Sequence, residues 1–98
     1  MQRRVWLTTL KAGKEAEYRH AHANVWPELI ESARACGLKN HTVFIHGRQV
    51  IAYIEAEDFE KSWQQLLKTD VKRRWTRLME GLFEDADGPS FEDIFHFN

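Results

Sequence analysis

The fold is decided by the stretch HTVFIHGRQVIAYIE, residues 41–55, which is typical of a β-hairpin. Its two arms, 41–46 and 49–55, are rich in β-branched and aromatic side chains, which favour strands. Gly47 and Arg48 join the arms, and a two-residue link is the commonest connection between antiparallel strands. We therefore predict a hairpin near the middle of the chain.

A strand and a helical segment precede the hairpin. Residues 3–10 have the strand-forming sequence RRVWLTTL, and a turn follows them. Residues 14–35 place apolar side chains close to helical spacing. Gly37 follows this segment, at the position where glycine commonly ends a helix. The first third of the chain therefore predicts a strand followed by a long helical region.

A proline interrupts the helical region. Pro27 lacks a backbone N–H and disfavours helical geometry in the residue before it. We expect the helix to kink or restart around 23–27, with Asn24 as the new N-cap. Tyr18 and His22 are four residues apart on the preceding turns, so their side chains should share one face of the helix.

Two shorter helices are predicted after the hairpin. Asp58 can cap a helix over 59–68, because a carboxylate accepts hydrogen bonds from first-turn amides. Asp70 can cap a second helix over 71–83 in the same way. The charged run at 72–74 is expected on the solvated side of this helix. Its apolar stripe is formed by Val71, Trp75, Leu78 and Leu82.

A loop over 84–90 and a final alternating strand over 91–97 complete the order β, α, β, β, α, α, β. This order predicts an α+β fold of the ferredoxin-like, split βαβ type. The fold has a four-stranded antiparallel sheet with its helices on one face. We expect residues 1–98 to form a single domain.

The face of the sheet opposite the helices should need a cover. We expect five large side chains there: Trp6, Phe44, Tyr53, Phe95 and Phe97. Such a patch is too large to leave in water, and a second copy of the chain is the simplest cover. The sequence therefore predicts a homodimer.

Composition narrows the class of protein. Apolar residues make up 43% of the chain, which favours a folded core over disorder. The 14 Lys and Arg residues nearly balance 15 Asp and Glu, which argues against a nucleic-acid partner. The apolar runs are too short to span a membrane, and the N-terminus does not resemble a secretory signal. The single cysteine, Cys36, fits a reducing cytoplasm.

His22 is the leading candidate for chemistry. An imidazole titrates near neutral pH and can act as a general acid or base. The simpler alternative is that Tyr18 and His22 belong to a half-buried helix face with satisfied hydrogen bonds. A metal site formed by His20 and His22 with His41 or His46 is not expected, because the helical i, i+4 histidine pair is missing.

Other candidate residues have stronger structural interpretations. Trp63 and Trp75 fit the core stripes of their helices, although Trp75 could also offer a flat apolar surface to a sugar ring. His41 opens a strand, where a histidine is often a surface residue. Cys36 is expected to be a small buried hydrophobe rather than a catalytic thiol.

Three motifs resemble the L-rhamnose mutarotase family. The run YRHAHANVWPEL, residues 18–29, is similar to its Y-x-x-x-H-x-x-x-W-P-E-L signature. CGLKN (36–40) resembles the family's G-x-x-N, and TDVKRRWTRLM (69–79) resembles its T-D-V-x-x-R-W-W-x-x-M. The aromatic and acidic end, EDIFHFN, is also similar. The motifs occur in the same order over nearly the whole chain.

The resemblance implies a cytoplasmic homodimer with a dimeric α/β-barrel fold, without metal or cofactor, that interconverts the α and β anomers of L-rhamnose. It places His22 on the proton donor and Tyr18 on the sugar-binding tyrosine. His41 stands where the family usually has a sugar-site tyrosine. Trp75 matches the first of two paired tryptophans, and Thr76 replaces the second. Since these departures lie in the sugar site, L-fucose or another pyranose is an alternative substrate.

The acid/base partner of His22 stays open among Tyr18, His41 and a bound water. Two other classes of function also remain as alternatives. The same barrel serves small oxygenases and haem-degrading enzymes, so the fold alone does not decide the activity. A non-catalytic sugar-binding dimer is the other alternative.

Overall fold

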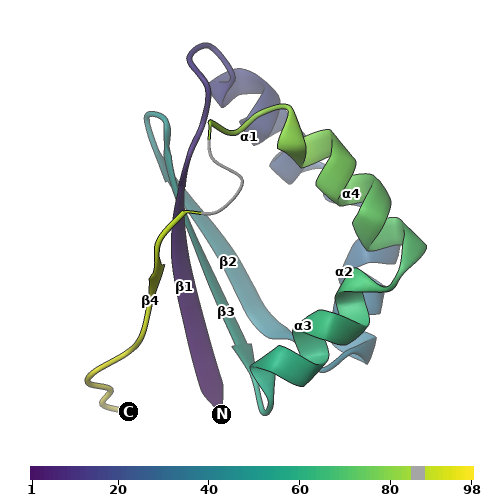
Figure 1. Cartoon of the computed structure of the whole chain (residues 1–98), viewed down its shortest axis with the longest axis vertical. Coiled ribbons are helices and arrows are strands. Elements are labelled where there is room, and N and C mark those ends of the chain that lie inside the picture. The colour runs from purple at the N-terminus through teal and green to yellow at the C-terminus, as the bar shows by residue number, and fades with distance from the viewer. Residues whose placement is uncertain (85–87) are drawn as a thin grey trace.

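The computed structural model describes residues 1–84 and 88–98. Eight elements follow one another along the chain (Figure 1). They are β1 (Gln2–Thr9), α1 (Glu15–Ala23), α2 (Pro27–Ala35), β2 (Lys39–His46), β3 (Gln49–Ala56), α3 (Phe59–Leu67), α4 (Asp70–Glu80) and β4 (Ser90–Phe91). The order of elements is the one that the sequence predicts, and the long helical region is divided into α1 and α2.

The predicted hairpin of β2 and β3 forms one half of a four-stranded antiparallel sheet with the order β2-β3-β1-β4. His46 pairs with Gln49 across the two-residue turn, and Gly47 has the positive φ of 59° that this turn requires. β1 pairs with β3 along its whole length, from Gln2 opposite Ala56 to Thr9 opposite Gln49. The predicted α+β, ferredoxin-like fold is confirmed.

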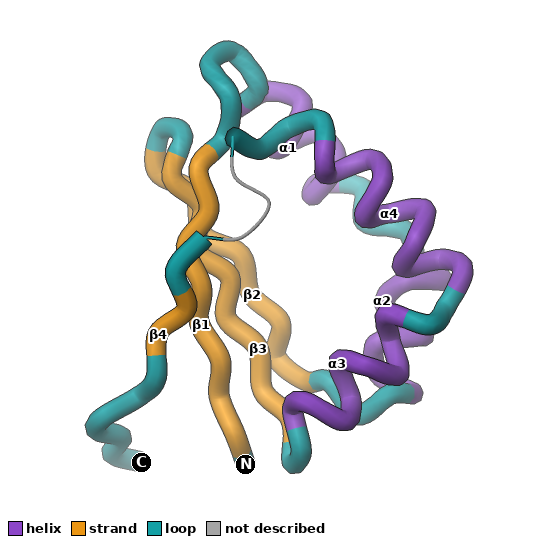
Figure 2. Tube along the Cα trace, viewed as in Figure 1, coloured by secondary structure: helices purple, strands orange, loops and turns teal. Residues whose placement is uncertain are grey.

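All four helices lie on one side of the sheet, as Figures 1 and 2 show. The core lies between the two layers. Alternate residues of β3 face the helices and are buried, as a strand with one covered face requires. The sheet contributes Leu10, Val50, Ala52, Ile54 and Ala56 to this core, and the helices contribute Tyr18, Leu29, Leu66, Val71, Trp75 and Met79.

The break at Pro27 is confirmed, but its cap differs from the prediction. Trp26, held in extended geometry at φ −60° and ψ 126°, is the N-cap of α2, and Pro27 is its first helical residue. The Trp26 carbonyl accepts hydrogen bonds from the amides of Leu29 at 3.0 Å and Ile30 at 3.2 Å. Asn24 instead ends α1, where its side chain donates to the His20 carbonyl at 3.2 Å. Asn24 is therefore too early in the chain to cap α2.

Asp58 caps α3 as predicted, through a hydrogen bond from the Lys61 amide at 3.3 Å. The cap of α4 was wrongly predicted. Thr69 is the N-cap and accepts from the Lys72 amide at 3.3 Å, because Asp70 already has helical geometry and pairs with Arg74.

The apolar stripe of α4 also differs at one position from the prediction. Val71, Trp75 and Leu82 are buried, but Leu78 is 47% exposed and Met79 takes its place in the core. The spacing 71, 75, 79, 82 follows one helix face more closely than a stripe through 78 does. Met79 fills this place with a long, adaptable apolar side chain.

The predicted C-terminal strand over 91–97 is wrong in its extent. β4 contains only Ser90 and Phe91, which pair with Trp6 and Val5. Glu92 and Asp93 have low strand propensity, and Asp93 pairs with Arg3 through its side chain instead of extending the backbone ladder. The predicted loop over 84–90 includes residues 85–87, which lie outside the described residues.

Glycine is required where the chain returns to the edge of the sheet. A Cβ atom on Gly88 would lie 1.5 Å from the carbonyl oxygen of Leu7, far inside van der Waals contact. The carbonyl oxygen of the next residue, Pro89, accepts a hydrogen bond from the Leu7 amide at 2.9 Å. The backbone of this segment is therefore pressed directly against β1.

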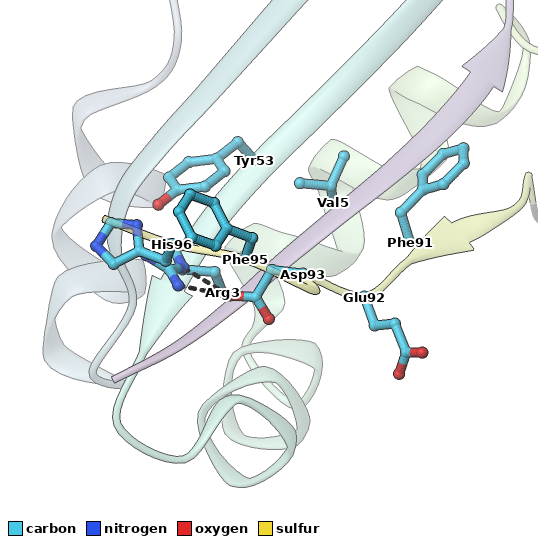
Figure 3. Close-up of a pocket in the computed structure, with 8 residues that line it drawn as sticks. All are labelled: Arg3, Val5, Tyr53, Phe91, Glu92, Asp93, Phe95 and His96. Atoms are coloured by element: carbon cyan, nitrogen blue, oxygen red, sulfur yellow. Dashed lines mark hydrogen bonds and ion pairs between the residues drawn. The ribbon is translucent and has the colours of Figure 1, made fainter. Parts of the chain in front are cut away.

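The open face of the sheet carries most of the large side chains predicted there. Phe44 is 57% exposed, and Tyr53 and Phe95 line one pocket on this face. Phe97 is 84% exposed and lies beyond the end of β4. Figure 3 shows Tyr53, Val5 and Phe91 beside this segment. The prediction that Trp6 lies on the open face was wrong, because Trp6 faces the helices and contacts Phe59 and Trp63. Its neighbour in the strand, Val5, takes the open face, as the alternation of a strand requires.

Candidate active site

The last turns of α1 bring the predicted tyrosine and histidine together. The rings of Tyr18 and His22 stack with centroids 4.1 Å apart and planes 30° apart. Tyr18 is 5% exposed and belongs to the core, whereas His22 is half-buried. The expected sharing of one helix face is confirmed. The two residues form one side of the helix-covered space above the sheet.

The hydrogen bond of His22 defines its protonation pattern. Its Nδ1 lies 3.0 Å from the carbonyl oxygen of Tyr18. A carbonyl oxygen can only accept, so Nδ1 carries a hydrogen and the neutral ring has its lone pair on Nε2. Burial lowers the pKa of His22, and the hydrogen bond to the Tyr18 carbonyl opposes this effect only in part. At neutral pH, His22 is therefore a neutral base with Nε2 available.

Tyr18 presents a phenol that stays protonated. Burial raises the pKa of Tyr18 to about 12. Phe83 packs edge-on against its ring with centroids 5.6 Å apart, which holds the ring on the side away from solvent. Such a hydroxyl is suited to donating a hydrogen bond to a ligand, and it is a poor base at neutral pH.

Trp75 supports the imidazole from α4. Its ring meets His22 at a centroid distance of 5.4 Å and an interplanar angle of 79°. Trp26, from the break between α1 and α2, contacts the other side of Trp75 at 5.1 Å. Trp75 is 7% exposed, so its interpretation as a core residue is confirmed. The three rings fix the position of the imidazole against the helix layer.

His41 reaches the same space from the sheet. It follows Asn40 at an irregularity in β2, where the pairing with β3 shifts between Lys39 and Thr42. Asn40 has a positive φ of 51°, and its side chain donates to Glu55 at 2.8 Å. Bulges of this kind redirect side chains and are frequent beside functional sites.

The surroundings of His41 keep it neutral. Its ring lies 6.5 Å from that of Trp6, and the residue as a whole is exposed to solvent. Desolvation by the surrounding protein, followed by the positive charges of Lys72 and His22, lowers the pKa of His41 to about 4. His41 is therefore a neutral imidazole at pH 7.

Lys72 lies close enough to His41 for its charge to act on that ring, although the charged run 72–74 was predicted on the solvated side of α4. The structure corrects this placement: Lys72 is half-buried, whereas Arg73 and Arg74 are exposed. Its Nζ lies 4.9 Å from the ring centroid of Trp63, close enough for a cation–π contact. Burial lowers the pKa of Lys72. One signal was available, because Lys72 lies three residues before Trp75 and so borders the buried stripe.

Thr76 lies to the side of this group of residues. It lines a surface groove with a volume of about 350 Å³ along α4. The groove is bordered by Leu67, Lys72, Arg73, Thr76, Arg77 and Glu80. Lys72 lines this groove and also lies over the ring of Trp63. The structure therefore brings Tyr18, His22 and Trp75 into contact. His41 lies beside Trp6 on the sheet, and Thr76 lies apart from both, in the groove along α4.

Two aromatic residues of the cleft were missed as site residues. Trp6 contacts Trp63 at a centroid distance of 5.7 Å, and together they form the wall between His41 and Lys72. Trp63 has the sequence signal of an ordinary core residue, and Trp6 was predicted on the open face of the sheet.

The described residues contain neither a group of metal ligands nor a membrane-spanning helix. Within residues 1–84 and 88–98, no three His, Cys, Asp or Glu side chains come close enough to hold a metal ion. His20 is exposed on α1, apart from His22. None of the helices in this part of the chain has the length and apolar character to span a bilayer.

Known structures share this fold. An L-rhamnose mutarotase from Formosa agariphila superposes with a TM-score of 0.80 and 19% identity, each chain being covered completely. A putative antibiotic biosynthesis monooxygenase from Bordetella bronchiseptica superposes with a TM-score of 0.75 and 12% identity, over 97% of this chain and 96% of that one. At these identities the likeness concerns the fold alone.

Sequence comparison distinguishes the mutarotase class from the monooxygenase class. The family profile described as L-rhamnose mutarotase matches residues 3–97. The L-rhamnose mutarotase of Opitutus terrae is 36% identical over 96 residues, covering 96% of this chain and 89% of that protein. The one from Bacillus subtilis is 31% identical over 86% of this chain and 82% of its own length. These matches favour the mutarotase over the oxygenase interpretation, and the chain belongs to the L-rhamnose mutarotase family of carbohydrate isomerases.

Proposed function

We propose that this chain interconverts the α and β anomers of L-rhamnose, or of a related 6-deoxyhexose, by acid/base opening and closing of the ring. Family membership supports the class of reaction. The single structural observation that carries the proposal is the hydrogen bond between His22 Nδ1 and the Tyr18 carbonyl. It leaves Nε2 of a neutral imidazole as a base beside a protonated phenol.

The reaction needs two coordinated proton transfers. Because His22 is neutral, it acts in this scheme first as the base and only on closure as the proton donor that the resemblance implies. Its Nε2 takes the proton of the anomeric hydroxyl, the bond between C1 and the ring oxygen breaks, and the ring oxygen takes a proton from a donor. The aldehyde then turns about the C1–C2 bond, and the ring closes on its other face. His22 returns its proton to the new anomeric oxygen. A well-placed group contributes about 10²- to 10⁴-fold to such a step.

The other sugar contacts are proposed from the cleft. Tyr18, with a pKa raised to about 12, donates a hydrogen bond that orients the sugar. His41 accepts or donates a hydrogen bond from the sheet side. Trp75 supports His22 and offers its remaining accessible edge to the apolar face of the ring. Thr76 borders the sugar site and makes it wider than a tryptophan would.

The proposal includes a homodimer in the cytoplasm. The exposed apolar side chains of the open sheet face, Phe44, Ile51 and Phe91, support a two-fold contact between copies. The single cysteine supports a reducing compartment. The proposed reaction moves only protons, so it requires neither a metal nor another cofactor.

The test is the rate of exchange between anomers, measured by NMR saturation transfer between the two anomeric protons. We expect His22→Ala to keep the fold and to lower the enzyme's acceleration by at least about 10²-fold. The matched control is His20→Ala, which removes an exposed imidazole from the same helix and should leave the rate unchanged. Undiminished exchange by His22→Ala would reject the role of His22.

A panel of sugars decides the substrate and the class of protein. L-rhamnose, L-fucose and other pyranoses would be compared with the same measurement. Binding without any acceleration of exchange would instead identify a non-catalytic sugar-binding protein. Acceleration with several sugars would rank them by the ratio of the enzymatic to the spontaneous rate.

A further inference from the structure

We propose that Arg74 is a positioning residue, which fixes the imidazole of His22 by clamping α2 against α4. This inference rests on the proposed function, because it explains how the imidazole is held in place for that reaction. Among the described residues, the side-chain hydrogen bonds of Arg74 go to two carboxylates. Its effect on the imidazole therefore has to pass through other side chains, and the contacts of Trp26 and Trp75 provide the route.

The guanidinium of Arg74 joins the first turns of two helices. Its Nε donates to Asp70 Oδ2 at 2.9 Å within α4, and its Nη2 donates to Glu28 Oε2 at 3.2 Å in α2. Each carboxylate lies in the first turn of its helix, where the positive end of the helix dipole stabilises it. The planar, five-donor group of an arginine can bind two carboxylates at once, which the point charge of a lysine does less well.

The same guanidinium also covers Trp26. Its central carbon lies 5.7 Å from the ring centroid of Trp26, close enough for a cation–π contact. Trp26 is the N-cap of α2, so its position depends on how α2 is held. Its ring meets Trp75 edge-on at 5.1 Å, and Trp75 meets His22 edge-on at 5.4 Å. A continuous series of contacts therefore leads from Arg74 to the imidazole.

The imidazole of His22 depends on these ring contacts for its direction. Its Nδ1 is held by the Tyr18 carbonyl at 3.0 Å, but a single hydrogen bond lets a ring tilt about the bonded atom. Tyr18 stacks against one side of the imidazole at 4.1 Å, and Trp75 meets it from α4. The direction in which Nε2 points toward a sugar therefore depends on the position of Trp75.

The clamp joins two stretches that the sequence analysis singled out separately. Trp26 and Glu28 belong to VWPEL (25–29), and Asp70, Arg74 and Trp75 belong to TDVKRRW (69–75). Arg74 is exposed, as the charged run 72–74 predicts, but its side chain reaches α2 across the gap in sequence. Exposed ion pairs contribute little to stability, so we expect the clamp to affect the reaction more than the fold.

The main test is Arg74→Met, which keeps an unbranched side chain beside Trp26 but removes both ion pairs. We expect exchange between the anomers of the best substrate to fall about tenfold, less than the roughly 10²-fold that a displacement of about 1 Å can cost. Arg73→Met is the matched control, because Arg73 is the exposed arginine at the preceding position and has no carboxylate within 4.0 Å among the described residues. It should keep the full rate, and equal rates for the two variants would overturn the proposal.

A second readout follows the position of the imidazole independently of activity. The C–H protons of His22 lie beside the rings of Tyr18 and Trp75, whose ring currents shift their NMR frequencies. We expect these frequencies to move in Arg74→Met and to stay unchanged in Arg73→Met, with both variants folded by circular dichroism. A loss of stability alone does not displace the ring in molecules that remain folded. Unmoved His22 resonances in Arg74→Met would therefore overturn the proposal.

Two further variants test the route and the need for a bridge. In a Trp26→Leu background the relay is already broken, so adding Arg74→Met should lower the rate by less than about twofold. A larger further loss would show that Arg74 acts by another route. Arg74→Lys keeps the charge without the planar group, and we expect less than about half of the wild-type rate. A rate of half or more would show that charge alone suffices, which would overturn the clamp.

The wild-type chain distinguishes a failure of this inference from a failure of the function on which it rests. A wild-type protein that accelerates exchange of none of the tested sugars would overturn the proposed function and the role of Arg74 together. An active wild type with an equally active Arg74→Met variant would overturn the role of Arg74 alone. An active wild type with a slow, folded variant whose His22 resonances move supports both.

Discussion

Polar side chains on the two sides of the sheet differ in whether they have protein partners. On the open face, Arg3 and Asp93 form an ion pair (Figure 3). The hydroxyl of Tyr53 donates to Glu55, so the polar side chains of this face have protein partners. On the helix-covered face, Lys72 reaches no carboxylate among the described residues. The lone pair of His22 is likewise left available by its hydrogen bond at Nδ1.

Apolar groups show the reverse distribution. The helix-covered face buries its aromatic rings against one another, whereas the open face exposes Phe44, Ile51 and Phe91. Unpaired polar groups in a cleft suit a small polar ligand. Exposed apolar groups with satisfied polar neighbours suit a protein surface. This difference supports the proposal that the sugar binds on the helix-covered face and a second copy of the chain on the open face.

The largest expected effect is a loss of stability when Trp75 is removed from the core on the helix-covered face. Trp75→Ala removes a buried indole that contacts both His22 and Trp26, and we expect a loss of about 3–5 kcal/mol in the free energy of unfolding. Urea denaturation measures this loss. Leu78→Ala is the control on the same helix, and its partial exposure predicts a loss well under half as large. Equal losses would contradict the assignment of Trp75 to the core.

A charge on the open face should separate the copies. Phe44→Asp places a carboxylate in the exposed apolar patch, so we expect a change from dimer to monomer in sedimentation equilibrium. Leu78→Asp, at a comparably exposed apolar position on α4, should leave the dimer intact. If Phe44→Asp stays dimeric, or the wild type is a monomer, the open face is not the dimer interface.

A tryptophan at the margin of the cleft should narrow the sugar site. Thr76→Trp restores the aromatic pair of the family motif, and we expect the exchange rate to shift toward L-rhamnose by about tenfold relative to other deoxyhexoses. This shift corresponds to about 1.4 kcal/mol of differential binding. NMR saturation transfer on the same sugar panel measures it. Unchanged relative rates would show that position 76 does not select the sugar.

The smallest expected effect concerns the pH dependence of stability. The pKa of His41 is lowered to about 4 in the folded chain, so between pH 6.5 and 4 the unfolded state binds more protons and stability falls as the pH falls. His41→Asn should reduce this slope. The reduction stays below about 1.4 kcal/mol per pH unit, the limit for one proton, because the ring keeps contact with solvent. Urea denaturation at several pH values would detect it, and an unchanged slope would contradict the shift.

Periodicity and turn chemistry predict most of the fold. The hairpin, the break at Pro27 and the cap at Asp58 depend on local rules, and the structure has all three. The errors occur where tertiary contacts decide. Residues after Phe91 alternate like a strand, but Asp93 bonds to Arg3 through its side chain, and no sequence pattern reveals that competition.

The candidate site is predictable to the extent that it lies on one element. Tyr18 and His22 are brought together by helix geometry alone. His41 and Lys72 come from a strand and from the fourth helix, so their approach depends on how the layers pack. Lysine is usually a surface residue. In the sequence, only the position of Lys72 three residues before Trp75 indicates that its side chain is half-buried.

The close contact at Gly88 has a consequence for the evolution of this chain. Any replacement would place its first side-chain carbon 1.5 Å from the Leu7 oxygen, so one of the two backbones would have to move. Random substitution at position 88 followed by selection for folded protein should therefore return glycine almost without exception. Because Gly88 carries a hydrogen atom where alanine carries a methyl group, the chain can lie against β1 and β4 can join the sheet.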